Sequence, residues 1–300
     1  MSARASKRPI AITPALLRRW RLPAPDADDD KHDRGVAMVI GGSAEIPGAL
    51  LLSGVAALRA GAGKLQLAAP RSAAPALGVA LPEARVFALP ETGSGYLDRK
   101  AGARAADCAR GADAVLIGPG MLGDADIRSF MDSLLPGIAD RSIVIDAVAL
   151  TALKGRRYQF RDEARVVLTP NYDEMGRLTG EPKDTIEADP RAAAERLARD
   201  SNAVVVLKGP ETFIAMPYGE TFRYSSGDVG LATSGSGDIL AGILVGLLAR
   251  GATLDQAAAW AVHLHGAAGN RLRQRMGQVG FLARELSDEV PALMNALAKR

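Results

Sequence analysis

The sequence predicts an α/β fold in which a mostly parallel sheet is covered by helices. From Val36 onward, short β-branched or apolar runs alternate with longer Ala- and Leu-rich stretches. The runs are continuously apolar, which is typical of parallel strands buried on both faces. With 300 residues, of which 48% are hydrophobic, the chain also has enough apolar material for a full core.

The predicted strands come in two groups. Five belong to βα units and span residues 36–40, 64–68, 114–117, 142–145 and 166–168. Three more, residues 203–207, 212–215 and 221–224, are joined by tight Gly/Pro turns, so the sheet is expected to end in an antiparallel portion. After Gly235 the spacing becomes helical over residues 236–250, 254–273 and 281–298, which predicts helices packed on the sheet.

One domain is expected after an N-terminal arm. Residues 1–34 contain Pro23, Pro25 and a cluster of aspartates, a composition typical of an arm rather than of a domain. The fold proper is expected to begin at Val36. Because no repeat or low-complexity linker divides the rest, residues 35–300 are predicted to form a single domain.

The composition argues against several classes of function. Lys and Arg total 37 against 34 Asp and Glu, and no long basic block is present, so nucleic acid is not an expected partner. The longest apolar run, residues 239–249, is far below the roughly 18 to 20 residues that span a bilayer. The single cysteine, Cys108, excludes a Cys-based zinc cluster. No signal-peptide core follows the N-terminal basic residues, and a cytoplasmic protein without membrane contact is expected.

Two glycine clusters follow predicted strands and precede helices. Gly41-Gly42-Ser43 places backbone N–H groups where an anion can bind, or else forms a tight turn for close packing, and both interpretations stay open. Residues 118–123 satisfy the GxGxxG pattern, but other strands precede this one and Pro119 is unusual in that motif. We therefore interpret residues 118–123 as a loop that lines a ligand cleft, not as a dinucleotide-binding fingerprint.

The strongest segment for chemistry is the glycine-rich turn before the long apolar helix. Gly235 and Gly237 flank Ser236, so successive N–H groups and the positive end of the helix point to one place, which predicts an anion-binding hole. Asp238 lies in the first helical turn, where a carboxylate either complements the helix dipole or accepts a proton from a hydroxyl that attacks a phosphoryl group.

Other polar residues follow predicted strands. Asn171 and Glu174 are candidates for the magnesium side of a phosphate site, or form a capping box, or both. Residues 208–212 place the Lys208 cation and a hydroxyl near a bound polyanion, although a solvated turn lysine is the alternative. His263 and His265 are two residues apart on a helix, so we interpret them as core or surface histidines and not as shared metal ligands. No lysine follows the glycines as in a Walker A loop.

Taken in order, several motifs resemble those of the ADP-dependent NAD(P)H-hydrate dehydratases. The matching segments lie between about Lys31 and the C-terminus and include Gly41-Gly42-Ser43, Pro47-Gly48-Ala49, residues 57–63, Gly118-Pro119-Gly120, Leu168-Thr169-Pro170, residues 230–242 and residues 265–269. The resemblance implies a ribokinase-like three-layer sandwich with a mostly parallel central sheet and helices on both faces. It also implies an enzyme that uses magnesium and a nucleoside diphosphate, or ATP in eukaryotic members.

The implied reaction is the ADP-dependent dehydration of the S epimer of hydrated NADH or NADPH, a carbon–oxygen lyase reaction. Phosphorylation of the ring 6-hydroxyl followed by elimination of phosphate replaces a poor leaving group with a good one. Asp238 would activate the hydroxyl, and the Ser236 and Gly237 amides would hold the phosphoryl group.

The resemblance also assigns residues by position. Those assigned to the hydrated cofactor are Ala49, Gly120, Asn171 and Asp238. Those assigned to the nucleotide are Lys208, Gly209, Pro210, Glu211, Thr212, Ser236 and Gly237. Glu174 stays the candidate for the metal, through direct or indirect contact.

The chain departs from the family pattern at three positions. Asn171 stands where the family usually has His, and Val148 and Thr151 replace Asp and Asn. The Asn171-x-x-Glu174 pattern is more typical of ribokinase-like kinases that act on a small alcohol such as a vitamin precursor or sugar, and this is one alternative. The changes at Val148 and Thr151 favour another, a non-catalytic nucleotide-binding protein of the same fold.

Two partners are further implied by the resemblance. Family members suggest a homo-oligomer, a tetramer. Because the chain has no room for the epimerase domain that is fused to some members, epimer conversion would need a separate epimerase.

Overall fold

The computed structural model describes residues 8–24, 34–155, 160–161, 165–225 and 229–298. One ten-stranded sheet runs through the molecule, with the strand order β1-β10-β9-β8-β7-β6-β5-β2-β3-β4. The strands are β1 Ile10–Ala11, β2 Val36–Ile40, β3 Lys64–Pro70, β4 Ala84–Leu89, β5 Ala114–Ile117, β6 Ser142–Ile145, β7 Arg165–Leu168, β8 Val204–Leu207, β9 Thr212–Ala215 and β10 Thr221–Tyr224. Only the β8–β9 and β9–β10 pairs are antiparallel, as the tight turns predicted.

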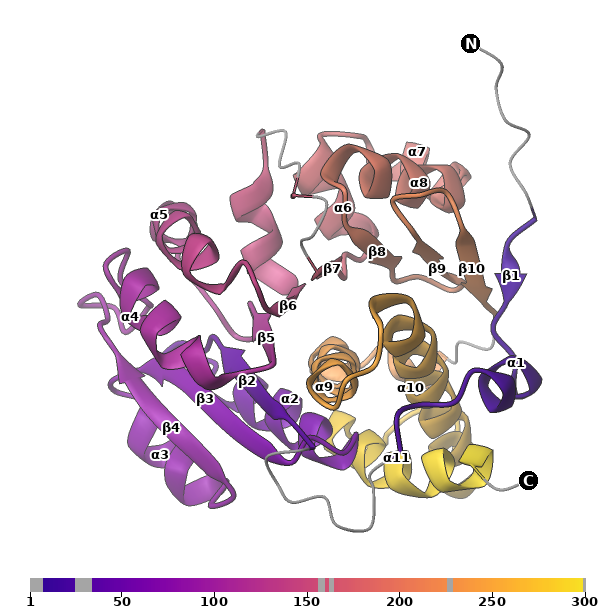
Figure 1. The fold of residues 1–300 in the computed structure, drawn as a ribbon, viewed down its shortest axis with the longest axis horizontal. Helices are drawn as coiled ribbons and strands as arrows, with labels where there is room; N and C mark the ends of the chain where they lie inside the picture. The colour runs from indigo at the N-terminus through magenta and orange to yellow at the C-terminus, as the bar shows by residue number, and fades with distance from the viewer. Residues whose placement is uncertain (1–7, 25–33, 156–159, 162–164, 226–228, 299–300) are drawn as a thin grey trace.

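Helices cover both faces of this sheet (Figure 1). The α-helices are α1 Pro14–Arg19, α2 Gly48–Arg59, α3 Ala74–Ala80, α4 Ala101–Cys108, α5 Asp124–Leu134, α6 Tyr172–Thr179, α7 Lys183–Ala188, α8 Pro190–Ser201, α9 Ser236–Ala249, α10 Leu254–Met276 and α11 Ala283–Ala298. Short 3-10 segments are η1 Ala109–Gly111, η2 Leu135–Ile138, η3 Ala147–Leu153 and η4 Val229–Leu231. None of the helices within these described ranges is both long and apolar enough to cross a membrane.

The two cores lie on opposite faces of the sheet because strand side chains alternate in direction. Ala37 and Val39 of β2 belong to one core cluster, which also holds buried residues of α1, α2, α3, α9, α10 and α11. Val36, Met38 and Ile40 of the same strand belong to the other, which also holds buried residues of α4, α5, α6, α7 and α8. The prediction of a three-layer α/β fold is confirmed.

Helix α9 is central to one core and is apolar on nearly all sides. Two glycines four residues apart let it approach α2. A Cβ on Gly242 would lie 2.3 Å from the Ser53 carbonyl oxygen, and one on Gly246 would lie 2.4 Å from the Ala57 carbonyl oxygen. The close contact fixes α9 against α2, the helix that carries Ala49 in its first turn.

The N-terminal segment is more closely integrated than expected. Strand β1 pairs in parallel with β10, so the prediction that the fold begins at Val36 is wrong. Leu17 of α1 is fully buried, the Trp20 ring stacks on Phe222 at 5.6 Å, and the Trp260 indole N–H donates to the Trp20 carbonyl oxygen at 2.8 Å. Strand β4 was also missed, because this half-exposed edge strand carries a weaker apolar pattern than the buried strands.

Candidate active site

The candidate site lies at the carboxyl ends of the central parallel strands, where ligands bind in open α/β sheets. Asp146 follows β6, Thr169 follows β7 and Lys208 follows β8 directly in the chain. Parallel neighbours end at the same edge, so these side chains meet although they lie 23 and 62 residues apart. Sequence reasoning had assigned a role in the site to Lys208 but not to Asp146 or Thr169.

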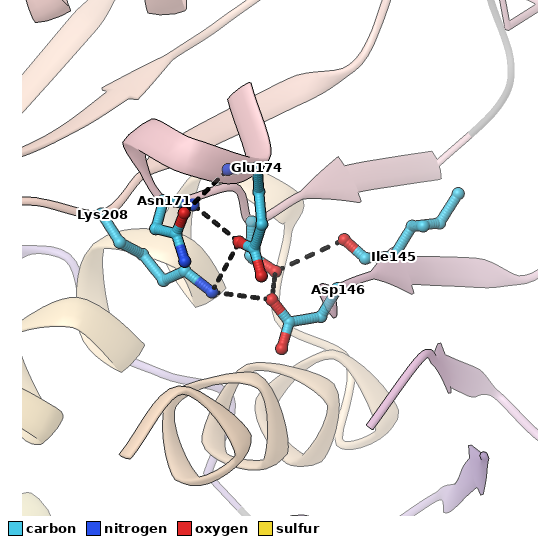
Figure 2. Close-up of polar contacts among 6 residues, drawn as sticks. Ile145, Asp146, Asn171, Glu174 and Lys208 are labelled. Carbon is cyan, nitrogen blue, oxygen red and sulfur yellow. Dashed lines mark hydrogen bonds and ion pairs between the residues drawn. The ribbon is translucent and has the colours of Figure 1, made fainter. Parts of the chain in front are cut away.

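A buried ion-pair cluster occupies this edge (Figure 2). The Lys208 ammonium Nζ lies 2.8 Å from Asp146 Oδ1 and 3.6 Å from Glu174 Oε2. Burial lowers the pKa of Lys208, but the Asp146 and Glu174 carboxylates outweigh it, so the net pKa is raised. With a side chain only 19% exposed, Lys208 is not the solvated turn lysine considered above.

Asn171 and Glu174 form the predicted capping box at the start of α6. The Asn171 side-chain oxygen accepts from the Glu174 N–H at 2.8 Å, and Glu174 Oε2 accepts from the Asn171 N–H at 2.7 Å. Burial raises the pKa of Glu174 more than the Lys208 charge lowers it. The capping and the site are therefore built from the same two side chains.

The amino end of α9 has the geometry of an anion hole. Gly235 precedes the helix with φ of +85°, a conformation that favours glycine. The Ser236 N–H donates to the Thr233 carbonyl oxygen at 3.2 Å, whereas the Gly237 and Asp238 N–H groups have no acceptor among the described residues. The free amides are therefore those of Gly237 and Asp238, one residue later than the resemblance implied.

Ser236 and His265 contact each other beside this hole. The Ser236 Oγ atom lies 2.9 Å from His265 Nε2 on α10. Burial, assisted by the Lys208 charge, lowers the pKa of His265 to about 4, so the imidazole is neutral near pH 7. His265 lines the pocket, and our interpretation of it as a core or surface histidine missed this role because the contact is formed only in three dimensions.

Asp238 lies in the first turn of α9 and is partly buried. Burial raises its pKa to about 7, with further contributions from the Asp146 and Glu174 charges and an opposing one from Lys208. A carboxyl group that titrates near neutral pH is well suited to accept a proton in a reaction at that pH.

A pocket with a volume of about 730 Å³ opens between these elements. Six of the seven residues assigned to the nucleotide line it: Lys208, Gly209, Pro210, Thr212, Ser236 and Gly237. Asn171 lines it as well. Glu211 lies outside the lining and pairs instead with Arg223 at 3.3 Å.

Ala49 and Gly120 lie together beside the loops after β2 and β5. A Cβ on Gly120 would lie 3.0 Å from the Ala49 Cβ and 2.4 Å from the Ile46 carbonyl oxygen. The Gly41 and Gly42 N–H groups donate to the Ala68 and Pro119 carbonyl oxygens at 3.0 and 2.7 Å. Because these two amides already donate to backbone carbonyl oxygens, they favour the packing interpretation of the Gly41-Gly42-Ser43 turn.

Helix α2 connects the two parts of the site. Ala49 is in its first turn, and Leu52, one turn further on, meets the Gly235 turn, where a Cβ on Gly235 would lie 2.4 Å from Leu52 Cδ1. The Ala49–Gly120 region and the α9 anion hole therefore share one supporting helix.

The other departures from the family pattern lie in η3. Val148 packs against the apolar core, and the Thr151 hydroxyl donates to the Val148 carbonyl oxygen at 2.6 Å. Among the residues that the structure describes, no group of three or more His, Cys, Asp or Glu side chains is arranged to hold a metal ion.

This architecture is that of the ribokinase-like proteins. A ribokinase-like superfamily protein from Enterococcus faecalis superposes with a TM-score of 0.84 at 26% identity, covering 99% of each chain. The crystal structure of an ADP/ATP-dependent NAD(P)H-hydrate dehydratase from Bacillus subtilis, co-crystallised with ATP and Mg²⁺, superposes with a TM-score of 0.85 at 32% identity, covering 97% of this chain and 99% of that one.

Sequence comparison defines the family within this class. A family model described as NAD(P)H-hydrate dehydratase matches residues 37–292. An ADP-dependent (S)-NAD(P)H-hydrate dehydratase from Xanthomonas campestris is 44% identical over 96% of this chain and 97% of its own length. The chain belongs to the NAD(P)H-hydrate dehydratase family. It spans about half the length, 53 to 54%, of several bifunctional NAD(P)H-hydrate repair enzymes that it also matches.

Proposed function

We propose that this chain catalyses the ADP-dependent dehydration of the S epimer of hydrated NADH and NADPH, which restores NADH and NADPH. The observation that carries the proposal is the position of Asp238. This carboxyl has a pKa of about 7 and lies in the first turn of a helix whose free amides lie beside Lys208 and the 730 Å³ pocket. The names of relatives that are similar over nearly the whole chain support the same reaction.

The reaction proceeds in two steps in this proposal. Asp238 accepts the proton of the ring hydroxyl while the hydroxyl oxygen bonds to the terminal phosphorus of ADP. The bond between that phosphorus and the bridging oxygen breaks, which releases AMP. The phosphate ester then loses its C–O bond, with the ring nitrogen supplying electrons, and inorganic phosphate leaves. The ring carbon next to the former C–O bond gives up a proton to solvent, which completes the double bond and restores dihydronicotinamide without any net oxidation or reduction.

The nucleotide side is assigned to residues 208–212 with Ser236 and Gly237. The Gly237 and Asp238 N–H groups, at the positive end of α9, offset the charge that develops on the transferred phosphoryl group. Lys208 is close enough to add a positive charge, since a Cβ on Gly237 would lie 3.5 Å from Lys208 Nζ.

The hydrated cofactor is assigned to Ala49, Gly120, Asn171 and Asp238. The assignment of Ala49 and Gly120 comes from the family resemblance; the two residues carry no large side chain and lie against each other, outside the lining of the 730 Å³ pocket. Asn171 lines the pocket at the start of α6 and supplies an amide at the junction with the nucleotide side.

Magnesium fits this site only as an ion carried mainly by phosphate. Mg²⁺ in nucleotide sites commonly keeps several waters and takes one or two carboxylates beside the phosphates. Glu174 would hold it through Oε1, because its Oε2 already accepts from Asn171 and lies near Lys208. When bound, the ion would neutralise phosphate charge.

Two features of the assembly belong to the same proposal. An epimerase would supply the S epimer; the bifunctional NAD(P)H-hydrate repair enzymes match this chain over about half of their length. We also assign the enzyme a homotetrameric state on the basis of family resemblance, to be tested by sedimentation or light scattering.

The direct test mixes purified protein with hydrated NADH, Mg²⁺ and ADP and follows the near-ultraviolet absorbance of dihydronicotinamide. We expect a rise that requires ADP and is lost with Asp238→Ala. No rise with either ADP or ATP would contradict the dehydratase assignment. A stable phosphate ester formed from a small alcohol would instead favour a ribokinase-like kinase, for which the Asn171–Glu174 pair is the supporting observation. Nucleotide binding without turnover would favour a non-catalytic protein.

A further inference from the structure

Asp146 connects three elements of the site but is not assigned to either ligand. It is 2% exposed, and its Oδ1 atom accepts from the Thr169 hydroxyl at 2.6 Å while contacting Lys208 Nζ at 2.8 Å. Figure 2 shows the Lys208 ammonium reaching this Asp146 oxygen. A buried carboxylate with two such partners is held in one orientation, because burial of an unpaired charge is costly.

The backbone at Asp146 is also closely confined. A Cβ on Gly118 would lie 1.9 Å from the Asp146 carbonyl oxygen. The backbone that follows β5 and the backbone that follows β6 are therefore so close that only glycine fits at position 118. The next residue, Ala147, has φ of +51°, which is uncommon for a residue with a Cβ. Strained backbone of this kind is concentrated at functional sites, where the surrounding structure maintains it.

Lys208 needs such a partner because it lies beside a second positive group. A Cβ on Gly237 would lie 3.5 Å from Lys208 Nζ, at the amino end of α9, where the helix dipole and the free amides are positive. Without a nearby anion, these groups repel the ammonium. The Asp146 carboxylate at 2.8 Å supplies that anion from the side of the sheet.

We propose that Asp146 is a positioning residue that holds the Lys208 ammonium against the amino end of α9, so that Lys208 and the Gly237 amide act together on the phosphate of the nucleotide. The inference rests on the proposed function for the identity of the nucleotide, ADP. Asp146 itself contacts neither ligand in this account; it acts through Lys208, and Thr169 fixes its orientation.

The Asp146 charge has a second, measurable consequence at Asp238. The groups that act on Asp238 are Asp146 and Glu174, which raise its pKa, and Lys208, which lowers it. Removing the Asp146 charge therefore moves the pKa of Asp238 down, whereas removing the Lys208 charge moves it up. The pKa shift therefore reports the Asp146 charge near Asp238, whereas the change in ADP affinity reports the action of Asp146 through Lys208.

The test compares Asp146→Asn and Thr169→Val with Asp113→Asn as a matched control. Asp113 precedes β5 at the opposite end of the sheet, where its Oδ2 accepts from the Val36 N–H at 2.8 Å. Calorimetry with ADP, the KM for ADP, and kcat/KM against pH are measured for each variant. For Asp146→Asn we expect ADP affinity to fall about tenfold or more, the loss typical of a charged hydrogen bond.

In Asp146→Asn, the acid limb of the kcat/KM profile against pH should move to lower pH by about one unit. This is the smaller end of the pKa shift that a nearby charge causes. Lys208→Met should move that limb in the opposite direction. Thr169→Val keeps both charges, so it should weaken ADP binding about two- to fivefold, consistent with one lost hydrogen bond, and leave the limb in place. Thr169→Val therefore keeps the test open should Asp146→Asn fail to fold.

The proposal is overturned if Asp146→Asn has the ADP affinity and the kcat/KM acid limb of Asp113→Asn. If Asp146→Asn does not fold, the proposal is overturned when Thr169→Val binds ADP with wild-type affinity. Failure of the proposed function looks different, because wild-type protein then shows no ADP binding, or binds ADP without converting hydrated NADH. Calorimetry needs no turnover, so the two failures are separated by the wild-type measurements alone.

Discussion

Two glycine-rich turns of this molecule look alike in sequence and differ in structure. Gly41-Gly42-Ser43 follows β2 and leads to α2, while the Gly235–Gly237 turn leads to α9. At the first turn, the Gly41 and Gly42 amides donate to carbonyl oxygens of neighbouring loops and strands. At the second, the Gly237 and Asp238 amides have no acceptor in the described part of the chain.

This difference shows what makes a glycine turn a binding site. In both places glycine allows close approach of backbone, but only the α9 turn leaves N–H groups free beside a cation, Lys208, and a pocket. The β2 turn uses its amides to fix the shape of the Ala49–Gly120 region. Glycine patterns predict tight turns, and the use of the amides decides whether such a turn binds an anion.

The largest effect is expected at the α9 turn itself. Asp238→Asn keeps the size of the side chain and removes its ability to accept a proton, so turnover should fall on the order of 10² to 10⁴-fold. Steady-state kinetics with calorimetry checks this, because ADP binding should persist. A variant that keeps more than a tenth of wild-type turnover would show that another group is the base.

Asp238→Asn should also change the pH dependence of stability. Folding raises the pKa of Asp238 from 3.8 to about 7, so the stability that its protonated form contributes is lost as pH rises through this window. The asparagine variant lacks this loss. At pH 8 its free energy of unfolding should exceed that of wild type by about 1 to 4 kcal/mol, so it should unfold at a higher denaturant concentration. Denaturant unfolding at pH 5 and pH 8 checks the sign. Equal stability of the two proteins at pH 8 would mean that Asp238 titrates normally.

Alanine substitutions in the two turns should separate stability from binding. A Cβ on Gly41 would lie 2.2 Å from the Pro119 carbonyl oxygen, so Gly41→Ala should destabilise the fold by about 1 to 3 kcal/mol. In Gly237→Ala the new Cβ meets only Lys208 Nζ, at an ordinary 3.5 Å, so stability should hold while ADP affinity falls. Thermal unfolding and ADP calorimetry on both variants test this. The reverse pattern, in which Gly237→Ala unfolds early and binds ADP normally, would undo the comparison.

The smallest effect is expected far from both turns. Trp260→Phe removes the indole N–H that donates to the Trp20 carbonyl oxygen at 2.8 Å and should cost about 1 kcal/mol. Activity and ADP affinity should match wild type, since this contact fixes the N-terminal segment to α10. A change in KM for ADP would indicate that this segment influences the site.

Much of the fold could be predicted from the sequence because buried parallel strands are continuously apolar. The edge strands β1 and β4 were missed, since one is two residues long and the other is half exposed. Asp238 could be found because its glycines are adjacent in the chain. Asp146 and His265 could not, because their partners Lys208 and Ser236 lie 62 and 29 residues away and meet them only in the folded chain.

The most direct test of the central claim is the stoichiometry of the products. With hydrated NADH, ADP and Mg²⁺, inorganic phosphate and dihydronicotinamide absorbance are measured in the same reaction, for wild type and for Asp238→Asn. The account predicts one phosphate released for each dihydronicotinamide formed by wild type, and neither product above background with Asp238→Asn. A stable phosphate ester without dihydronicotinamide, or dihydronicotinamide formed without release of phosphate, would contradict it.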